Sequence, residues 1–153
     1  MPGEVYNAAV AMLARRELSE TQLRQRLTRK GYDRADIDAA LARLKSERSL
    51  DDERVAGAIA RTEAHLRKHG KVRVRQRIQA AGIASAIADR IADEVFADID
   101  PEILLAAALE KRLRGQPLPT DDRGRQRLYR YLIGQGFEHD RVLAALRARR
   151  SST

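Results

Sequence analysis

The 153-residue chain contains no cysteine and no tryptophan, and only 4% of its residues are aromatic. Without cysteine it can form no disulfide bond, no thiolate nucleophile and no cysteine-ligated zinc site, which fits a reducing compartment. The scarcity of aromatic side chains means that the core must be built from Leu, Ile, Val and Ala. Alanine at helical spacing favours close packing between helices.

Long apolar runs are also missing, since none approaches the ~18 residues needed to span a bilayer. The first residues, Met1-Pro2-Gly3-Glu4, lack the charged and apolar regions of a secretory signal peptide. We therefore expect a cytoplasmic protein that does not bind a membrane.

Catalytic signatures are absent from the sequence, which has no phosphate-binding loop, dinucleotide fingerprint or Ser/His/Asp arrangement. The acidic runs Asp51-Asp52-Glu53 and Asp121-Asp122 are typical of helix N-termini, where carboxylates cap the backbone and oppose the macrodipole. His65 and His69 have the i,i+4 spacing of metal ligands, but no third ligand stands at a useful spacing. We expect no enzymatic activity, no metal and no cofactor.

Acidic residues are outnumbered by basic ones, 22 against 30, which gives a formal net charge of +8. Such an excess favours an anionic partner, and nucleic acid or an anionic membrane surface is the usual candidate. Most of these cations are arginine, so the bias of a GC-rich gene is an alternative explanation. The clustering of the charge along the chain favours a functional basic surface.

Apolar residues recur with helical periodicity along the whole chain, and no strand pattern is convincing. Ser19 with Gln22 forms a capping-box pattern, Asp33 stands at a further N-cap position, and Asp100-Pro101 suits the first turn of another helix. The expected helices are three within 5–47, followed by 52–69, 71–81, one carrying Ile87, Ile91 and Val95, and then 101–114, 121–135 and 138–149, with a loop at 115–120.

The helix predicted over 52–69 is the longest of the set. Its apolar stripe would place Val55, Ile59, Thr62 and Leu66 toward the core. Gly70 would end it, because glycine is favoured just beyond a helix C-terminus.

A repeated signal divides the chain into three. The motif Arg-Gln-Arg followed by Leu or Ile occurs at 24–27, 75–78 and 125–128, and each copy precedes a glycine and a large apolar residue. These are Gly31-Tyr32, Gly82-Ile83 and Gly136-Phe137. The period predicts an all-α fold of three tandem three-helix repeats, 1–48, 49–99 and 100–150, stacked into an elongated, curved body. A compact helical bundle is the alternative.

The segment 64–88 contains no acidic residue although it holds several cations. Exposed helices usually mix both signs of charge and gain i,i+4 ion pairs, which this helix does not. Arg73 and Arg77 would lie on one flank of its apolar stripe and Arg75 on the other. Such a face can bind phosphates or the carboxylates of a partner, and a solvated helix face is the alternative.

Basic clusters in all three repeats make up the candidate interface. In the third cluster, Tyr129 and Tyr131 would either stack on bases or pack partly into the core. The candidate partner- and nucleic-acid-binding residues are Arg24, Arg26, Lys30, Arg67, Lys68, Lys71, Arg73, Arg75, Arg77, Arg125, Arg127 and Arg130.

Over residues 5–149, these segments resemble the RecX family of bacterial recombinase regulators. The resemblance rests on residues 13–17 before Ser19, on 23–32, on 70–83 and on 132–137. Its most distinctive segment is Leu50-Asp51-Asp52-Glu53-Arg54-Val55-Ala56. The order and spacing of these motifs are more specific than any one of them.

The resemblance implies tandem three-helix repeats that bind the RecA–DNA filament. Members of the family lie along the filament groove, contact neighbouring RecA protomers, and block growth or promote disassembly. Recombination, repair, the ATPase of RecA and repressor cleavage in the SOS response decline as a result. The implied partners are the RecA filament and, weakly and without sequence preference, single- and double-stranded DNA, with the chain expected to be a monomer.

The residues themselves leave two other classes of function open. Three-helix units can carry helix-turn-helix geometry, so one alternative is a sequence-specific DNA-binding transcriptional regulator. That function needs a recognition helix with base-reading Asn or Gln beside Arg. The other alternative is a scaffold protein with no nucleic-acid partner.

Overall fold

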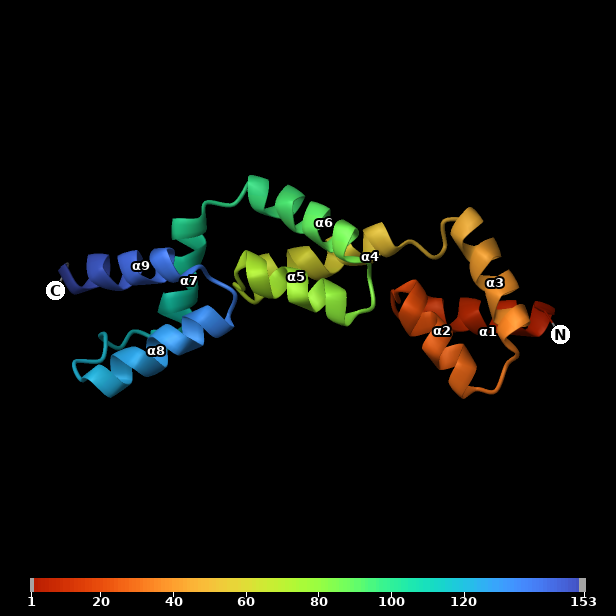
Figure 1. The fold of residues 1–153 in the computed structure, drawn as a ribbon, viewed down its shortest axis with the longest axis horizontal. Coiled ribbons are helices and arrows are strands. Elements are labelled where there is room, and N and C mark those ends of the chain that lie inside the picture. Colours follow the sequence, from red (N-terminus) through yellow and green to blue (C-terminus); the bar gives the residue numbers. More distant parts are fainter. Residues whose placement is uncertain (1, 152–153) are drawn as a thin grey trace.

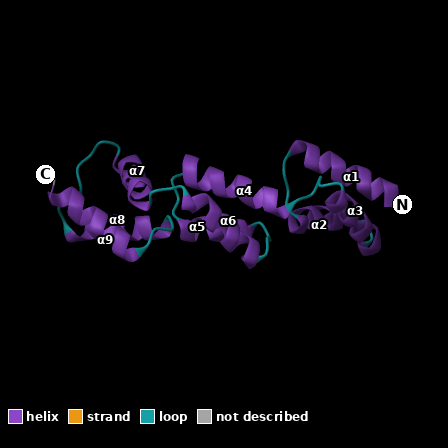
Figure 2. Ribbon diagram, turned by 90° about the horizontal axis from the view of Figure 1, so that it is seen from above, coloured by secondary structure: helices purple, strands orange, loops and turns teal. Residues whose placement is uncertain are grey.

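The computed structural model describes residues 2–151, and within these it contains helices and loops but no strand. The three-helix pattern recurs three times, which confirms the predicted fold class (Figures 1 and 2). The first unit comprises α1 (Pro2–Arg15), α2 (Glu20–Arg29) and α3 (Arg34–Ser46); the second α4 (Asp52–Arg61), the π-helical turn η1 (Thr62–Leu66), α5 (Lys71–Ala80) and α6 (Ser85–Ala97); the third α7 (Pro101–Leu113), α8 (Asp122–Gly134) and α9 (His139–Ser151).

The three units follow one another along a single long axis, with the two ends of the chain at opposite ends of the body (Figure 1). The accessible surface is 9767 Å². A compact protein of the same 17.2 kDa mass would expose about 7,800 Å². The excess surface agrees with an elongated stack and argues against a compact bundle.

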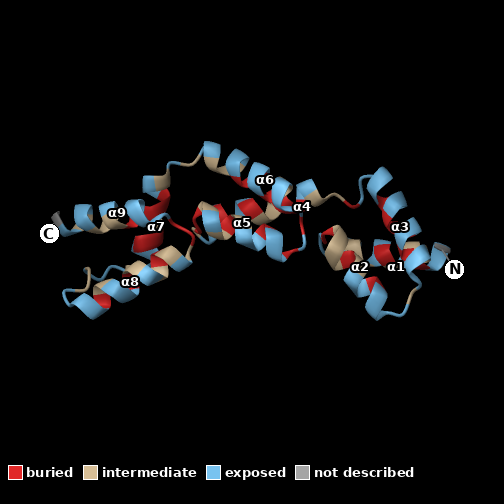
Figure 3. Cartoon of the chain, in the orientation of Figure 1, coloured by how far each residue is buried: buried red, intermediate tan, exposed pale blue. Residues whose placement is uncertain are grey.

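Each unit has its own apolar core, visible as buried segments on the inner sides of its helices (Figure 3). Burial of these side chains is the main force that holds each three-helix group together. The central core residues are Val5, Leu23, Leu27, Leu41 and Leu44 in the first unit, Val55, Val74, Ile78, Ala88 and Ile91 in the second, and Leu105, Leu109, Leu128, Leu132 and Val142 in the third.

The helix ends largely follow the predicted capping chemistry. Ser19 and Gln22 form a complete capping box at the start of α2. Asp51 and Asp100 accept hydrogen bonds from backbone N–H groups at the starts of α4 and α7. Asp33 stands at the N-cap of α3, but its side chain makes no capping hydrogen bond.

The helix predicted over 52–69 is wrong in its second half. Beyond Arg61 the chain forms a π-helical turn, in which the Arg67 N–H donates to the Thr62 carbonyl at 3.1 Å. Thr62 and Leu66 are exposed, so the predicted stripe is wrong in its second half. The buried face runs instead through Ala56, Ala60, Glu63 and Ala64, which lie on one side at helical spacing.

Gly70 does not end this helix as predicted. Lys68 takes the left-handed backbone conformation, with φ +58°, and Gly70 is the N-cap of α5 with φ −78°. Glycine is needed at Gly70 for a different reason, since a Cβ there would lie 2.4 Å from the carbonyl oxygen of Gly136.

The joint between the first and second units is formed by the turn that ends α5. The Ser19 hydroxyl donates to the Ala81 carbonyl, and the Thr21 hydroxyl donates to the Gly82 carbonyl at 2.9 Å. Asp52 adds a third bond across the joint, accepting from the Glu20 N–H at 2.8 Å. The start of α2 is thus held by the glycine turn of the next unit, and the acidic run at residues 51–53 has a structural role.

The joint between the second and third units repeats this arrangement with backbone donors. The Gly70 N–H donates to the Gln135 carbonyl at 2.7 Å, and the Val72 N–H to the Gly136 carbonyl at 3.3 Å. When the repeats are aligned on their glycines, Gly70 and Val72 correspond to Ser19 and Thr21. The glycine turn therefore covers the start of the second helix in both joints.

The start of α8 is covered in a different way. Gly124 corresponds to Gly70 in the alignment, and a Cβ there would lie 2.6 Å from Pro119 Cβ and from Asp121 Oδ1. The loop 115–120, predicted as a break, therefore lies where the neighbouring units place a glycine turn. This difference makes the third unit the least typical of the three, as terminal repeats often are.

Candidate interaction surface

The second helices of the three units, α2, α5 and α8, lie on the same side of the long body (Figure 1). Each carries one copy of the Arg-Gln-Arg motif. The three helices that carry the predicted basic clusters thus lie on a common side of the molecule. Their local environments differ, and those differences decide which cations are available to a partner.

In the first unit, the predicted residues divide into a paired one and two unpaired ones. Arg24 donates from Nη1 to Asp38 Oδ1 at 2.5 Å and lies 3.8 Å from Glu20. Arg26 and Lys30 have no ion pair or side-chain hydrogen bond within residues 2–151. Both line a pocket of about 470 Å³ between α1 and α2.

This pocket, here called the α1–α2 pocket, is lined by five cations and no carboxylate among the described residues. Its other lining residues are Ala8, Ala11 and Met12, and its cations are Arg15, Arg16, Arg26, Arg29 and Lys30. Like charges without counter-ions in a concave surface raise the local positive potential and attract an anion. Among the predicted clusters, this one has no acid among the described residues that line its pocket.

The sequence did not predict three of these five cations as part of the interface: Arg15, Arg16 and Arg29. Arg15 and Arg16 lie at the C-terminal end of α1, whereas Arg29 lies one turn beyond Arg26 in α2. Nothing in the sequence says that these segments meet. The one available signal was the i,i+3 spacing of Arg26 and Arg29, which places them on one helix face.

In the second unit, α5 contains no acidic residue, but acidic residues of other helices pair with its cations. Lys71 pairs with Asp93, and Arg75 lies 4.0 Å from Asp89. Both acids come from α6, which packs against α5. The acid-free segment of the sequence is therefore not acid-free in space.

Glu63 is the second source of compensating charge. It is 5% exposed and lies 3.3 Å from Arg77 and 3.7 Å from Arg67, and it also bonds His69 Nδ1. Burial raises the pKa of Glu63, but hydrogen bonds from His69 and Arg77 outweigh this and bring the pKa below its ordinary value. Glu63 is thus an ionised carboxylate that organises its surrounding cations.

His69 is held in its neutral form by the same environment. Burial lowers the pKa of His69, and the Glu63 carboxylate opposes that change without cancelling it. The neutral ring then donates its Nδ1 proton to Glu63. Both residues are buried beside the joint at Gly70, so the pair stabilises the region where the second unit meets the third.

Arg73 belongs to the same joint. It donates from Nη1 to the Gly134 carbonyl at 3.2 Å, and its Nε is buried without a hydrogen-bond partner among the described residues. Lys68 is the one predicted residue of this unit with no ion pair or side-chain hydrogen bond in the described chain. The second unit therefore offers a partner less unpaired charge than its sequence predicts.

In the third unit, Arg125 is tied to the neighbouring loop. It donates to the Pro119 carbonyl at 3.3 Å and to the Thr120 carbonyl at 2.6 Å. Arg127 is exposed, without an ion pair or side-chain hydrogen bond in the described residues, and Arg130 lies 3.5 Å from Gln126 Oε1.

The two tyrosines of this cluster are engaged within the unit. Tyr129 bonds His139 and meets its ring edge-on at 5.4 Å between centroids. Tyr131 carries the Arg112 guanidinium 4.5 Å from its ring centroid. Both rings are half-buried and pack against the core, so their geometry favours the packing interpretation over base stacking.

The two histidines predicted at i,i+4 spacing lie in different environments. His65 is exposed while His69 is buried against Glu63, and no group of three metal-ligating side chains occurs among residues 2–151. None of the described helices combines the length and apolar character required to cross a bilayer.

Family models match two parts of the chain. The model of the first three-helix domain of RecX matches residues 6–44, and that of the third three-helix domain matches residues 102–146. The chain is 35% identical over 145 residues to the regulatory protein RecX of Halorhodospira halophila, with 94% of this chain and 87% of the relative covered.

A second relative and a solved structure agree. The regulatory protein RecX of Acidithiobacillus ferrooxidans is 35% identical over 143 residues, which cover 93% of this chain and 88% of the relative. The crystal structure of RecX from Lactobacillus salivarius superposes with a TM-score of 0.79 at 16% identity, covering 96% of this chain and 95% of that one. The solved structure supports the fold, and the curated relatives support the family.

Proposed function

The chain belongs to the RecX family of regulatory proteins, and on that premise we propose that it binds the RecA–DNA filament and acts as a negative regulator of RecA. It would restrict filament extension, and with it the ATPase, strand-exchange and co-protease activities of RecA. The effect would come from binding and not from catalysis by the chain itself. Binding to a filament on bacterial DNA would require the protein to be in the cytoplasm.

The observation that carries the proposal is an elongated body with basic residues on the second helix of each unit. Stacked repeats provide an extended surface that can contact more than one subunit of a polymer. Several weak contacts on one rigid body gain avidity, because each contact raises the effective concentration of the next. Hydrogen bonds at the glycine turns of Gly82 and Gly136 connect each unit to the next, which favours one continuous surface.

Within that surface, the α1–α2 pocket would be the principal anion-binding site. Its five cations share the pocket with no acid among the described lining residues, whereas most cations of α5 are already paired with Glu63 or with acids of α6. DNA phosphates or acidic side chains of RecA would serve as its ligand. Contacts to phosphate carry no sequence information, so binding to DNA would be weak and independent of sequence.

Co-sedimentation with RecA filaments on single-stranded DNA tests the proposal. The double variant Arg26→Glu, Arg29→Glu should lose most of its binding, since it reverses two cations of the pocket. A matched control, Arg34→Glu with Lys111→Glu, makes the same change in net charge at exposed positions outside the pocket. An equal loss of binding in both variants would show that net charge alone acts, and native binding by the double variant in the pocket would show that the pocket is not the site. Failure of the native chain to co-sediment would reject the proposed function.

A further inference from the structure

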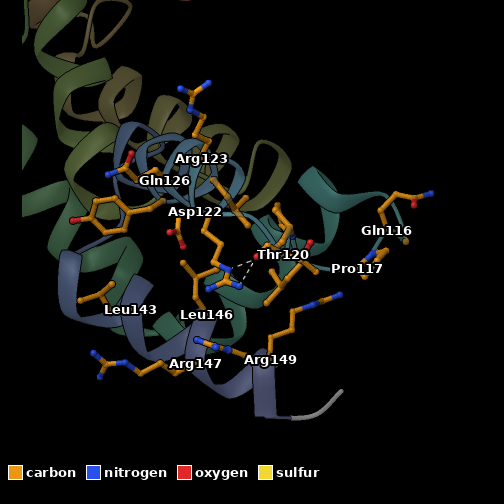
Figure 4. Close-up of a pocket in the computed structure, with 17 residues that line it drawn as sticks. Gln116, Pro117, Thr120, Asp122, Arg123, Gln126, Leu143, Leu146, Arg147 and Arg149 are labelled. Carbon is orange, nitrogen blue, oxygen red and sulfur yellow. Dashed lines mark hydrogen bonds between the residues drawn. The ribbon is translucent and has the colours of Figure 1, made fainter.

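The third unit contains a larger pocket, of about 1020 Å³, distant from the α1–α2 pocket. The loop 115–120 forms one side of it, and α8 and α9 form the others (Figure 4). Its volume lies at the upper end of the range usual for ligand sites, about 300–1,000 Å³. Neither unit 1 nor unit 2 has a loop of this kind between its first and second helices, so the pocket is particular to the third unit.

The interior of this pocket, here called the α8–α9 pocket, is largely apolar. Leucines from all three of its sides line it: Leu118 from the loop, Leu128 from α8, and Leu143 and Leu146 from α9. Leu128 is 6% exposed and belongs to the core, whereas the other three are half-buried. An apolar side chain entering here would cover leucine surface that is now in contact with water.

The rim of the pocket is basic. Asp122 is the one acid among the described lining residues, against five arginines: Arg123, Arg125, Arg147, Arg149 and Arg150. Arg125 is held in place by hydrogen bonds to the carbonyls of Pro119 and Thr120. Arg149 pairs with Glu110 at the edge of α7. Arginine rather than lysine suits carboxylate ligands, because the planar guanidinium can bind both carboxylate oxygens.

We propose that the α8–α9 pocket binds an acidic peptide segment that carries apolar side chains on one face. The leucines would receive those side chains. Arg123, which is exposed and has no ion pair or side-chain hydrogen bond among the described residues, would meet the carboxylates, and the other rim arginines would add positive potential. An amphipathic helix in a groove is a common form of this recognition. A nucleic acid strand fits less well, because it would leave the leucine surface uncovered and the nearby Tyr129 ring is already engaged by His139.

Fluorescence anisotropy with synthetic peptides tests this inference without RecA, so its outcome is separate from that of the proposed function. The probe is a labelled helical peptide of about sixteen residues, with Leu at i, i+4 and i+7 and Glu on the opposite face. A second peptide replaces each Leu with Ser, and an oligothymidylate of equal charge is the third ligand. The leucine peptide should bind at least about tenfold more tightly than either of the others.

Variants locate the binding site. Leu143→Ser should weaken the leucine peptide about tenfold while leaving the serine peptide unchanged. Leu66→Ser is its matched control, because Leu66 is 72% exposed in the second unit, and it should have no effect. Arg123→Glu, at an exposed residue outside the core, should weaken the leucine peptide severalfold, and it provides the test if Leu143→Ser does not fold.

Three results would overturn the inference. The first is equal affinity for the leucine and serine peptides, which would mean attraction by charge alone. The second is unchanged binding of the leucine peptide to both Leu143→Ser and Arg123→Glu. The third is tighter binding of the oligothymidylate with the same sensitivity to Leu143→Ser, which would assign the pocket to nucleic acid.

Discussion

Substitution of Gly136 by alanine is expected to open the joint between the second and third units. Gly136 has φ +99°, and a Cβ there would lie 2.4 Å from the backbone nitrogen of Arg73. Neither the backbone of Arg73 nor that of Gly70 can move aside without breaking the hydrogen bonds at the start of α5. The units would therefore separate at this point.

Gly31→Ala is the matched control for this experiment. Gly31 has φ +89° at the equivalent position of the first unit, but no described atom lies within 4 Å of the place that a Cβ would occupy. Both substitutions carry the cost of a left-handed alanine, about 1–2 kcal/mol. Gly136→Ala should additionally lose the bonds donated by Gly70 and Val72, at about 0.5–1.5 kcal/mol each. The expected difference between the two variants is therefore about 1–3 kcal/mol.

Urea denaturation followed by circular dichroism measures that difference as a change in the free energy of unfolding. Small-angle scattering should also show a larger radius for Gly136→Ala than for Gly31→Ala, since only the former loosens a joint. Equal destabilisation of the two variants, with equal radii, would refute the assignment of Gly136 to a rigid inter-unit contact.

Three further predictions concern Glu63, His69 and Arg26. The pKa of His69 is below its ordinary 6.5 and that of Glu63 below 4.5. The contribution of His69 to the free energy of unfolding is therefore complete above pH 6.5 and falls as the pH drops below that value. The contribution of Glu63 is complete above pH 4.5 and falls below it. The melting temperature of the native protein should be lower at about pH 5.5 than at about pH 8, and His69→Gln should reduce that difference. Equal melting temperatures of the native protein at the two pH values would contradict this role of His69. Glu63→Gln should destabilise the fold by about 1–3 kcal/mol, because the amide has one acceptor oxygen for the two donors, His69 and Arg77, and no negative charge. An unchanged unfolding midpoint would exclude this role. Affinity for single-stranded DNA should fall steeply with salt, and Arg26→Glu should reduce the log–log slope by about 0.7 or more, while Lys111→Glu leaves it unchanged.

Local features of this fold were predictable because short segments of sequence determine them. Ser19 with Gln22 specifies a capping box within four residues, and Gly82 before a large apolar residue specifies a left-handed turn. The repeated motif then predicts that the same unit recurs. Stacking follows, because three short helices bury too little apolar surface alone.

The features that were not predictable depend on residues distant in sequence. No local pattern signals the π-turn at 62–66. Glu63 is buried beside Ala60 and Ala64, where only the cations and histidine of the folded unit can stabilise its charge. The acids that neutralise α5 lie in α6, outside the segment that contains none. The α1–α2 pocket joins arginines from two helices whose contact no local pattern indicates.

The availability of the predicted site residues to a partner stays a prediction. The structure distinguishes those already engaged within the fold, such as Arg73 and Arg125, from those without a partner among the described residues, such as Arg26 and Arg127. Variants of the second group should affect binding more than stability, and variants of the first should do the reverse.

ATP turnover by RecA on single-stranded DNA, titrated with this protein, tests the proposed regulation most directly. We expect the rate to fall at less than one copy of the chain per RecA, because a body that caps or bridges a filament acts on many protomers. Without RecA the chain should hydrolyse no ATP. Undiminished turnover at a several-fold excess of protein, with its folding verified by circular dichroism, would contradict the proposal that this chain restrains RecA.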